Sequence, residues 1–291
     1  MSKKTQIPPK FETAKEPVRY RRAVVTFLDI LGFASLVKSG DADKVEHVLS
    51  AVRKYAIPES HDQMDNEEPT ICSVAFSDSI VRVRFLDGDN LRYPIGHVLS
   101  EINELSLIQG ELISENIILR GALTIGEIYL NQGIIFGPAM VTAYELESKL
   151  AIYPRIVIDP KVLNEVRKDA TLRRDGHSGT DEIKEIRNLV ARGDNGLWYI
   201  NYLASMCGQL DNPDHLPALL QAHKHLITSR YSTSEQTKGY LDKLLWLAVY
   251  HNKIISKFLP VELNGLKLRA SDFEVKTTEI SVLARLPRTT H

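Results

Sequence analysis

The sequence has 291 residues, of which 43% are hydrophobic and 25% are charged. These fractions are typical of a globular protein and allow one large core or two modest ones. Lysine plus arginine (36) nearly balances aspartate plus glutamate (37), which gives a net charge of -1. Because the chain has no broad positive field, we expect neither a nucleic-acid partner nor a membrane partner.

Targeting and disulfide signals are absent from the sequence. The two cysteines, Cys72 and Cys207, lie far apart and outside any metal-binding spacing, as suits a reducing compartment. The N-terminal stretch carries charges and three prolines where a secretory signal needs an apolar run, and no later run approaches membrane-spanning length. We therefore expect a cytoplasmic protein in which residues 1–20 form a flexible arm.

The first predicted elements follow hydrophobic periodicity. Residues 23–28 form an apolar, β-branched run at odd and even positions alike, which predicts a strand buried on both faces and ending at Asp29. Asp41 or Asp43 can cap the helix that follows, which stops near residue 58. The later predictions, in chain order, are an acidic loop (61–69), a hairpin (71–85), a helix (95–111), a strand (117–128), a tight turn (133–137), a helix (139–149), a strand (155–158), a helix (160–166), a surface loop (167–181), a strand (197–200), two helices (215–230 and 234–258) and a tail with weak strand character.

The order strand, helix, hairpin, helix, strand is typical of a ferredoxin-like βαββαβ sheet, so the predicted fold class is α+β. We expect the flanking helices to cover one face of this sheet. The long C-terminal helices are expected to pack against the same body as an extension.

Two aspartates stand out at the ends of predicted strands. Asp29 is followed by the turn residue Gly32. In such an arrangement the carboxylate can face a divalent cation, while backbone N–H groups of the turn can bind a triphosphate. Alone, Asp29 would be interpreted as an ordinary turn or capping residue. Asp78, at the tip of the predicted hairpin, changes this, because two carboxylates brought together repel unless cations lie between them.

A set of motifs in fixed order resembles the class III adenylyl and guanylyl cyclases. They are Phe27-Leu28-Asp29-Ile30-Leu31-Gly32-Phe33, Ser77-Asp78-Ser79, Arg120-Gly121-Ala122-Leu123-Thr124-Ile125-Gly126, Phe136-Gly137-Pro138-Ala139 with the helix after it, and Val190 to Tyr199. The resemblance covers residues 24 to about 203, and it implies a catalytic domain at 21–205 with a C-terminal extension at 206–291. It also implies a homodimer whose sites lie at the subunit interface.

The resemblance assigns roles to individual residues. It implies that Asp29, Ile30 and Asp78 hold two Mg²⁺ or Mn²⁺ ions per active site. Gly32, Phe33 and Arg192 would bind the triphosphate, with Arg192 in the place of a phosphate-binding lysine. For Arg192, a solvated turn residue is an equally good interpretation. Arg120 is a further catalytic candidate.

The chain departs from the family where adenine is read and where the transition state is stabilised. The adenine-reading positions fall near Ser73 and Val74 and on Pro138, which offer one hydroxyl and two apolar side chains. The stabilising asparagine and arginine fall on Val141 and Glu145. Base contacts are therefore expected from Ser73, Pro138 and Tyr55, whose ring could stack on a pyrimidine, although plain packing is the commoner role of such a tyrosine.

Together with the helical segment Trp246-Leu247-Ala248-Val249-Tyr250-His251-Asn252, these departures resemble the pyrimidine cyclases of bacterial Pycsar antiphage systems. That resemblance implies a UTP or CTP substrate, cyclic UMP or cyclic CMP as product, and a separate effector that responds to it. Two alternatives stay open. One is a purine cyclase with an atypical base pocket, and the other is a catalytically silent nucleotide-binding or dimerisation module.

Overall fold

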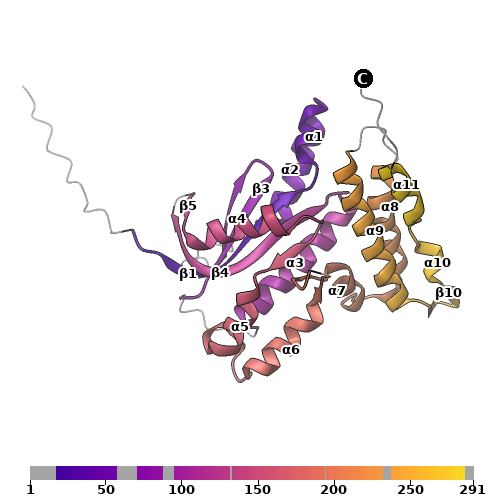
Figure 1. Ribbon diagram of the computed structural model, residues 1–291. Helices are drawn as coiled ribbons and strands as arrows, with labels where there is room; N and C mark the ends of the chain where they lie inside the picture. Colours follow the sequence, from indigo (N-terminus) through magenta and orange to yellow (C-terminus); the bar gives the residue numbers. More distant parts are fainter. Residues whose placement is uncertain are drawn as a thin grey trace, which may run out of the picture.

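The computed structural model describes residues 18–57, 71–87, 95–131, 133–193, 195–231 and 237–285 (Figure 1). Predictions for residues 1–17 and for the acidic loop at 61–69 lie outside this part of the chain. The strands are β1 (Arg21–Ile30), β2 (Ile71–Phe76), β3 (Ser79–Phe85), β4 (Leu119–Asn131), β5 (Ile134–Phe136), β6 (Ile156–Ile158), β7 (Val190–Arg192), β8 (Trp198–Ile200), β9 (Val261–Leu263) and β10 (Leu266–Leu268). The helices are α1 (Phe33–Lys38), α2 (Ala42–Ala56), α3 (His97–Ser114), α4 (Pro138–Leu150), α5 (Pro160–Lys168), α6 (Gly179–Leu189), α7 (Tyr202–Gly208), α8 (Leu216–Tyr231), α9 (Lys238–Phe258), α10 (Ala270–Phe273) and α11 (Thr277–Arg285), with short 3-10 turns η1 (Ala170–Leu172) and η2 (Pro213–His215).

A mixed sheet in the order β2-β3-β1-β4-β6-β8-β7 forms the centre of the protein, with β5 paired to β4. Strand β1 is antiparallel to both β3 and β4, whereas β4 and β6 run parallel. β1 occupies an inner position because residues 23–28 are buried on both faces, as its continuous apolar run predicts. The predicted α+β class and the βαββαβ arrangement of β1 to β4 are confirmed.

Helices cover both faces of the sheet, so the expectation of one covered face is wrong (Figure 1). Alternate residues of β1 point to opposite faces. Thr26 accordingly donates a hydrogen bond to Glu101 of α3, whereas the ring of its neighbour Phe27 contacts the ring of Tyr144 on α4. Coverage of this second face was not predicted because the apolar residues on the sheet-facing side of α4 are alanines, which give only a weak hydrophobic signal.

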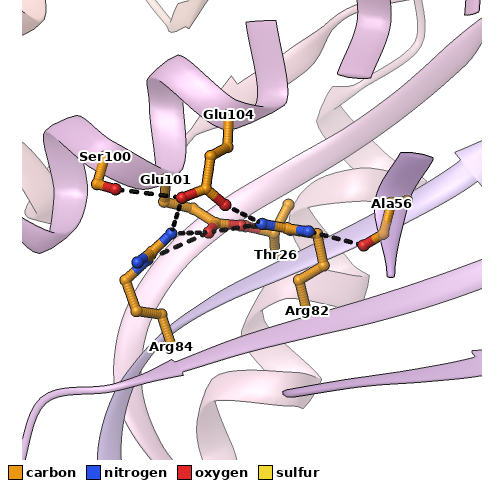
Figure 2. Close-up of polar contacts among 7 residues, drawn as sticks. All are labelled: Thr26, Ala56, Arg82, Arg84, Ser100, Glu101 and Glu104. Atoms are coloured by element: carbon orange, nitrogen blue, oxygen red, sulfur yellow. Dashed lines mark hydrogen bonds and ion pairs between the residues drawn. The ribbon is translucent and has the colours of Figure 1, made fainter. Parts of the chain in front are cut away.

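An ionic network is buried between β3 and α3 (Figure 2). Arg82 donates to Glu101 at 2.9 Å, and Arg84 donates to Glu104 at 2.6 Å. Burial alone would raise the pKa of Glu101, but the charges of Arg82 and Arg84 outweigh it and lower the pKa to about 2. The network therefore keeps charged side chains inside the core only because each cation has a carboxylate partner.

The segment after β8 shares the main core with the sheet. Leu244 and Leu247 of α9 belong to the same buried cluster as Val24 and Leu28 of β1. A hydrogen-bonded row of buried rings, formed by Tyr202, His223 and His251, joins α7, α8 and α9. α9 therefore contributes to the main core, while the predicted division at 205/206 into a catalytic domain and an extension falls inside α7 and stays a prediction.

Two further differences concern polar segments. The predicted surface loop at 167–181 contains η1 and the start of α6, whose capping box joins Ser178 and Asp181. The tail after residue 259 forms the β9–β10 hairpin and two short helices. Within the described residues, every helix is too short or too polar to cross a bilayer.

Candidate functional site

Asp29 lies at the end of the central strand, as predicted. It is the penultimate residue of β1, and it pairs in register with Ser79 of β3 and Arg120 of β4. The chain then turns through Gly32, whose φ of 87° is in the left-handed region that favours glycine, and α1 begins at Phe33. The local sequence thus places a carboxylate, a tight turn and a helix start in succession.

Asp78 reaches the same place from the neighbouring hairpin. It sits with Ser77 in the two-residue turn between β2 and β3, and Ser77 has a positive φ of 54°. Burial is the main cause of the raised pKa of Asp29, and the charge of Asp78 raises it further. The structure therefore brings together the two predicted metal-binding carboxylates.

Arg120 links Asp29 to a third carboxylate. Its Nε donates to Asp29 Oδ2 at 2.9 Å, and its Nη2 forms an ion pair with Glu147 Oε1, also at 2.9 Å. The side chain of Glu147 is only 3% exposed, and burial raises its pKa against the opposing effect of Arg120. Arg120 thus pairs with both carboxylates at once.

Glu147 was missed by sequence reasoning, although a signal was present. It follows Ala139 and Ala143 at intervals of four, and all three are buried on the sheet-facing side of α4. A glutamate at a core-facing helical position needs a partner of opposite charge, because an unpaired buried charge is costly. The spacing could have flagged it as the partner of a strand cation.

The C-terminal helix α9 brings two more side chains to this place. The ring of Tyr240 lies 3.2 Å from the position that a β-carbon on Gly32 would occupy. One turn farther along α9, Lys243 interacts electrostatically with Asp29, Glu147 and Arg120. Burial and then Arg120 lower the pKa of Lys243, while the two carboxylates oppose that shift. No local pattern in the sequence predicts this approach, which depends on the packing of α9.

The donor set fits a hard divalent cation. Asp29 and Asp78 offer carboxylate oxygens where β1 ends and β2 turns into β3, and Mg²⁺ is commonly bound by one or two carboxylates together with substrate phosphates and water. Within the described ranges, three or more His, Cys, Asp or Glu side chains do not gather into a metal site. Any cation site here would therefore need oxygens from a ligand, and Arg120 would have to leave Asp29. Ile30, the next residue of β1, has a buried side chain.

The predicted phosphate-binding Arg192 lies on another part of the sheet. It ends β7, the edge strand, and its Nε donates to the carbonyl of Gly196 at 3.2 Å. Strands β4, β6 and β8 separate β7 from β1. One chain therefore does not bring Arg192 to Asp29.

The predicted base-binding residues are also spread out. Ser73 pairs in register with Arg82, so it lies on the face covered by α3, opposite to Asp29. Tyr55, in the last turn of α2, is half-buried against the main core. Pro138 is exposed at the first turn of α4. The structure does not gather these three residues around the carboxylates.

No protein-family model matches the sequence. A search of curated proteins also finds no match. Among solved structures, the catalytic core of a rhodopsin-guanylyl cyclase with converted specificity in complex with ATPαS matches 62% of this chain and 95% of its own, with 14% identity and a TM-score of 0.35. A class III adenylyl cyclase-like ATP-binding protein from Pseudomonas aeruginosa matches 62% of this chain and 44% of its own, with 11% identity and a TM-score of 0.33. Overlaps of this quality assign neither a family nor a function.

Proposed function

We propose that this protein is a nucleotidyl cyclase. It converts a pyrimidine nucleoside triphosphate, UTP first and CTP second, to the 3',5'-cyclic monophosphate and pyrophosphate. The observation that supports this proposal is the meeting of Asp29 and Asp78 beside the Gly32 turn. A pair of carboxylates next to a tight turn suits a metal-bound triphosphate.

The chemistry is divided between metals and side chains. Two Mg²⁺ or Mn²⁺ ions, when bound, lower the pKa of the ribose 3'-hydroxyl and neutralise the leaving pyrophosphate. Asp29 and Asp78 would hold these ions, together with Ile30, which follows Asp29 on β1. Gly32 and Phe33 are the proposed triphosphate contacts in the following turn. Arg120, released from Asp29 but still paired with Glu147, can turn its guanidinium toward a phosphate oxygen.

The proposed preference for pyrimidines depends on what surrounds the site. Val74 pairs in register with Val81 on the sheet face that carries Asp29, and Pro138 begins α4. Neither side chain can read the donor and acceptor pattern of a purine, so base choice would come from shape and stacking. Tyr55, Ser73 and Pro138 remain predicted base contacts, and of the two neighbours Ser73 and Val74 only Val74 lies on the sheet face of Asp29.

A homodimer would complete the site. α4 exposes Val141 at 59% and Tyr144 at 54%, and the Tyr144 ring also contacts Phe27 at the border of the sheet-facing side. Apolar side chains exposed together on one helix are typical of an interface. A second copy covering this face could supply Arg192 to a site that one chain leaves without it.

One observation favours the silent module as a second candidate. Arg120 already forms an ion pair with Asp29. Val141 and Glu145 offer no cation at the positions where class III cyclases stabilise the transition state. A purine cyclase is the remaining alternative. The antiphage role, the cytoplasmic location and the separate effector rest on the sequence resemblance.

Substitution of the two aspartates tests the proposal. In Asp29→Asn and Asp78→Asn, formation of cyclic nucleotide should fall by roughly 100-fold or more, because each removes an anionic metal ligand. Asp43→Asn, an exposed aspartate on α2, is the matched control and should keep wild-type activity. Full activity in either of the first two variants, with product formed by the wild type, would remove the proposed metal site.

A further inference from the structure

The C-terminal helix α9 touches the turn on which the triphosphate site is built. Tyr240, in its first turn, packs against Gly32, and the Tyr240 hydroxyl accepts a hydrogen bond from Arg230 Nη1 at 2.9 Å. α8 and α9 are neighbours, so this bond fixes the start of α9 relative to the end of α8 (Figure 1). The first turn of α9 is therefore held against the turn that follows β1.

Lys243 follows Tyr240 by three residues, so both side chains project from the same side of α9. Lys243 is half-buried and lies within electrostatic range of Asp29, Glu147 and Arg120. Arg120, not Lys243, forms the ion pairs with these two carboxylates. Among the described residues, the Lys243 ammonium thus lies near these two carboxylates without a direct ion pair to either.

The half-buried ammonium of Lys243 would be stabilised by a bound anion. Arg120 pairs with Glu147 and, until a cation binds, with Asp29, and the proposed cations would take Asp29 and Asp78. A triphosphate brings several negative charges to the same place. A lysine there can act as a point charge on phosphate oxygens, and no cation from Val141 or Glu145 competes for that role.

We propose that Lys243 binds the triphosphate of the nucleotide and stabilises the pyrophosphate leaving group, so that the C-terminal helices complete the active site. This inference rests on the proposed cyclase function. In the reaction, the ribose 3'-oxygen loses its proton to water and forms a bond to the α-phosphorus. The bond from that phosphorus to the bridging oxygen breaks, and its electron pair leaves on pyrophosphate. Lys243 pairs with the negative charge that develops there.

Binding and turnover can be measured separately. The full chain and its Lys243→Met variant are titrated with inorganic tripolyphosphate in the presence of Mn²⁺ by calorimetry, and kcat and KM are measured for UTP and CTP. Lys243→Met should raise the Kd for tripolyphosphate by about tenfold, the loss of one charge-assisted contact. The kcat should fall by roughly 100-fold.

Three comparisons make the result specific. Lys253→Met, at an exposed lysine on the same helix, should leave both quantities unchanged, and Lys243→Arg should restore most of the binding. The melting temperature of each variant shows whether the fold is intact. If Lys243→Met binds tripolyphosphate as the wild type does, or if Lys243→Arg is as weak as Lys243→Met, the inference is wrong.

The proposed function can fail without this inference. A wild type that binds tripolyphosphate through Lys243 but forms no cyclic nucleotide would contradict the cyclase and support a nucleotide-binding site that includes α9. A wild type that does not bind tripolyphosphate with Mn²⁺ would overturn the role of Lys243.

Discussion

Two carboxylates in this protein, the buried Glu101 and the half-buried Asp29, respond differently to arginine. Glu101 is fully buried, yet two arginines bring its pKa to about 2, well below its ordinary value. Asp29 has only Arg120, and the charge of Asp78 adds to the effect of burial, so its pKa is raised. The difference separates a structural carboxylate, whose charge is fully compensated, from a site carboxylate that retains unmet charge for a further cation.

Glu101→Gln should lower the free energy of unfolding by about 3 kcal/mol, because Arg82 and Arg84 would lose their shared anion inside the core. Urea unfolding at neutral pH measures the loss. Glu111→Gln, at an exposed position of the same helix, is the control and should change the free energy by less than about 0.5 kcal/mol.

The pH dependence of unfolding has a definite sign. Because the pKa of Glu101 is lowered from 4.5 to about 2, its contribution is present above pH 4.5 and is lost as the pH falls toward 2. The difference in unfolding free energy between wild type and Glu101→Gln should therefore shrink over that range. A difference that is small at pH 7, or constant down to pH 2, would show that the network does not stabilise the fold.

At the scale of single elements, the features that neighbouring residues determine could be predicted. The strand is present and continues one residue past Asp29, the hairpin carries Asp78 at its tip, and Asp41, one of the two proposed caps, caps the helix. Helix α6 was missed because its residues are mostly polar, although Ser178 and Asp181 form a capping box and Ile183 and Ile186 are buried. In this case the capping residues carried more information than the hydrophobic periodicity.

The candidate site could be predicted only in part. Asp29, Asp78 and Arg120 come from adjacent strands, so strand pairing alone brings them together. Glu147 required recognition of a charge on the buried side of α4, and Lys243 depends on the docking of α9 far along the chain. Ser73 went to the opposite face because the period-two alternation of a strand separates it from Val74.

At the scale of the whole molecule, the sheet separates the residues that a triphosphate site would use. Asp29 and Asp78 lie near one end of the strand order, whereas Arg192 lies on the edge strand β7 at the other. The exposed apolar side of α4 offers a surface on which a second copy could dock. A two-fold dimer would repeat any site formed across it, with each chain giving a different half.

Mixing two inactive variants tests this arrangement. Asp29→Ala and Arg192→Ala should each be inactive as pure proteins, yet a 1:1 mixture allowed to exchange subunits should recover about a quarter of wild-type activity. Half of the dimers are then mixed, and each has one intact site. Val141→Arg, which places a charge on the exposed side of α4, should abolish the recovery and give a monomer by sedimentation. If the mixture stays inactive while subunits exchange, Arg192 does not act across the interface.

The central claim is that this protein makes a cyclic nucleotide. The most direct measurement incubates the purified chain with equal concentrations of UTP, CTP, ATP or GTP and Mn²⁺, and identifies the products by mass spectrometry. Val74 and Pro138 offer a purine no hydrogen-bonding side chain, so we expect cyclic UMP as the main product, cyclic CMP next, and little from ATP or GTP. A clear preference for ATP or GTP would contradict the base assignment, and the absence of cyclic product from all four would contradict the cyclase itself.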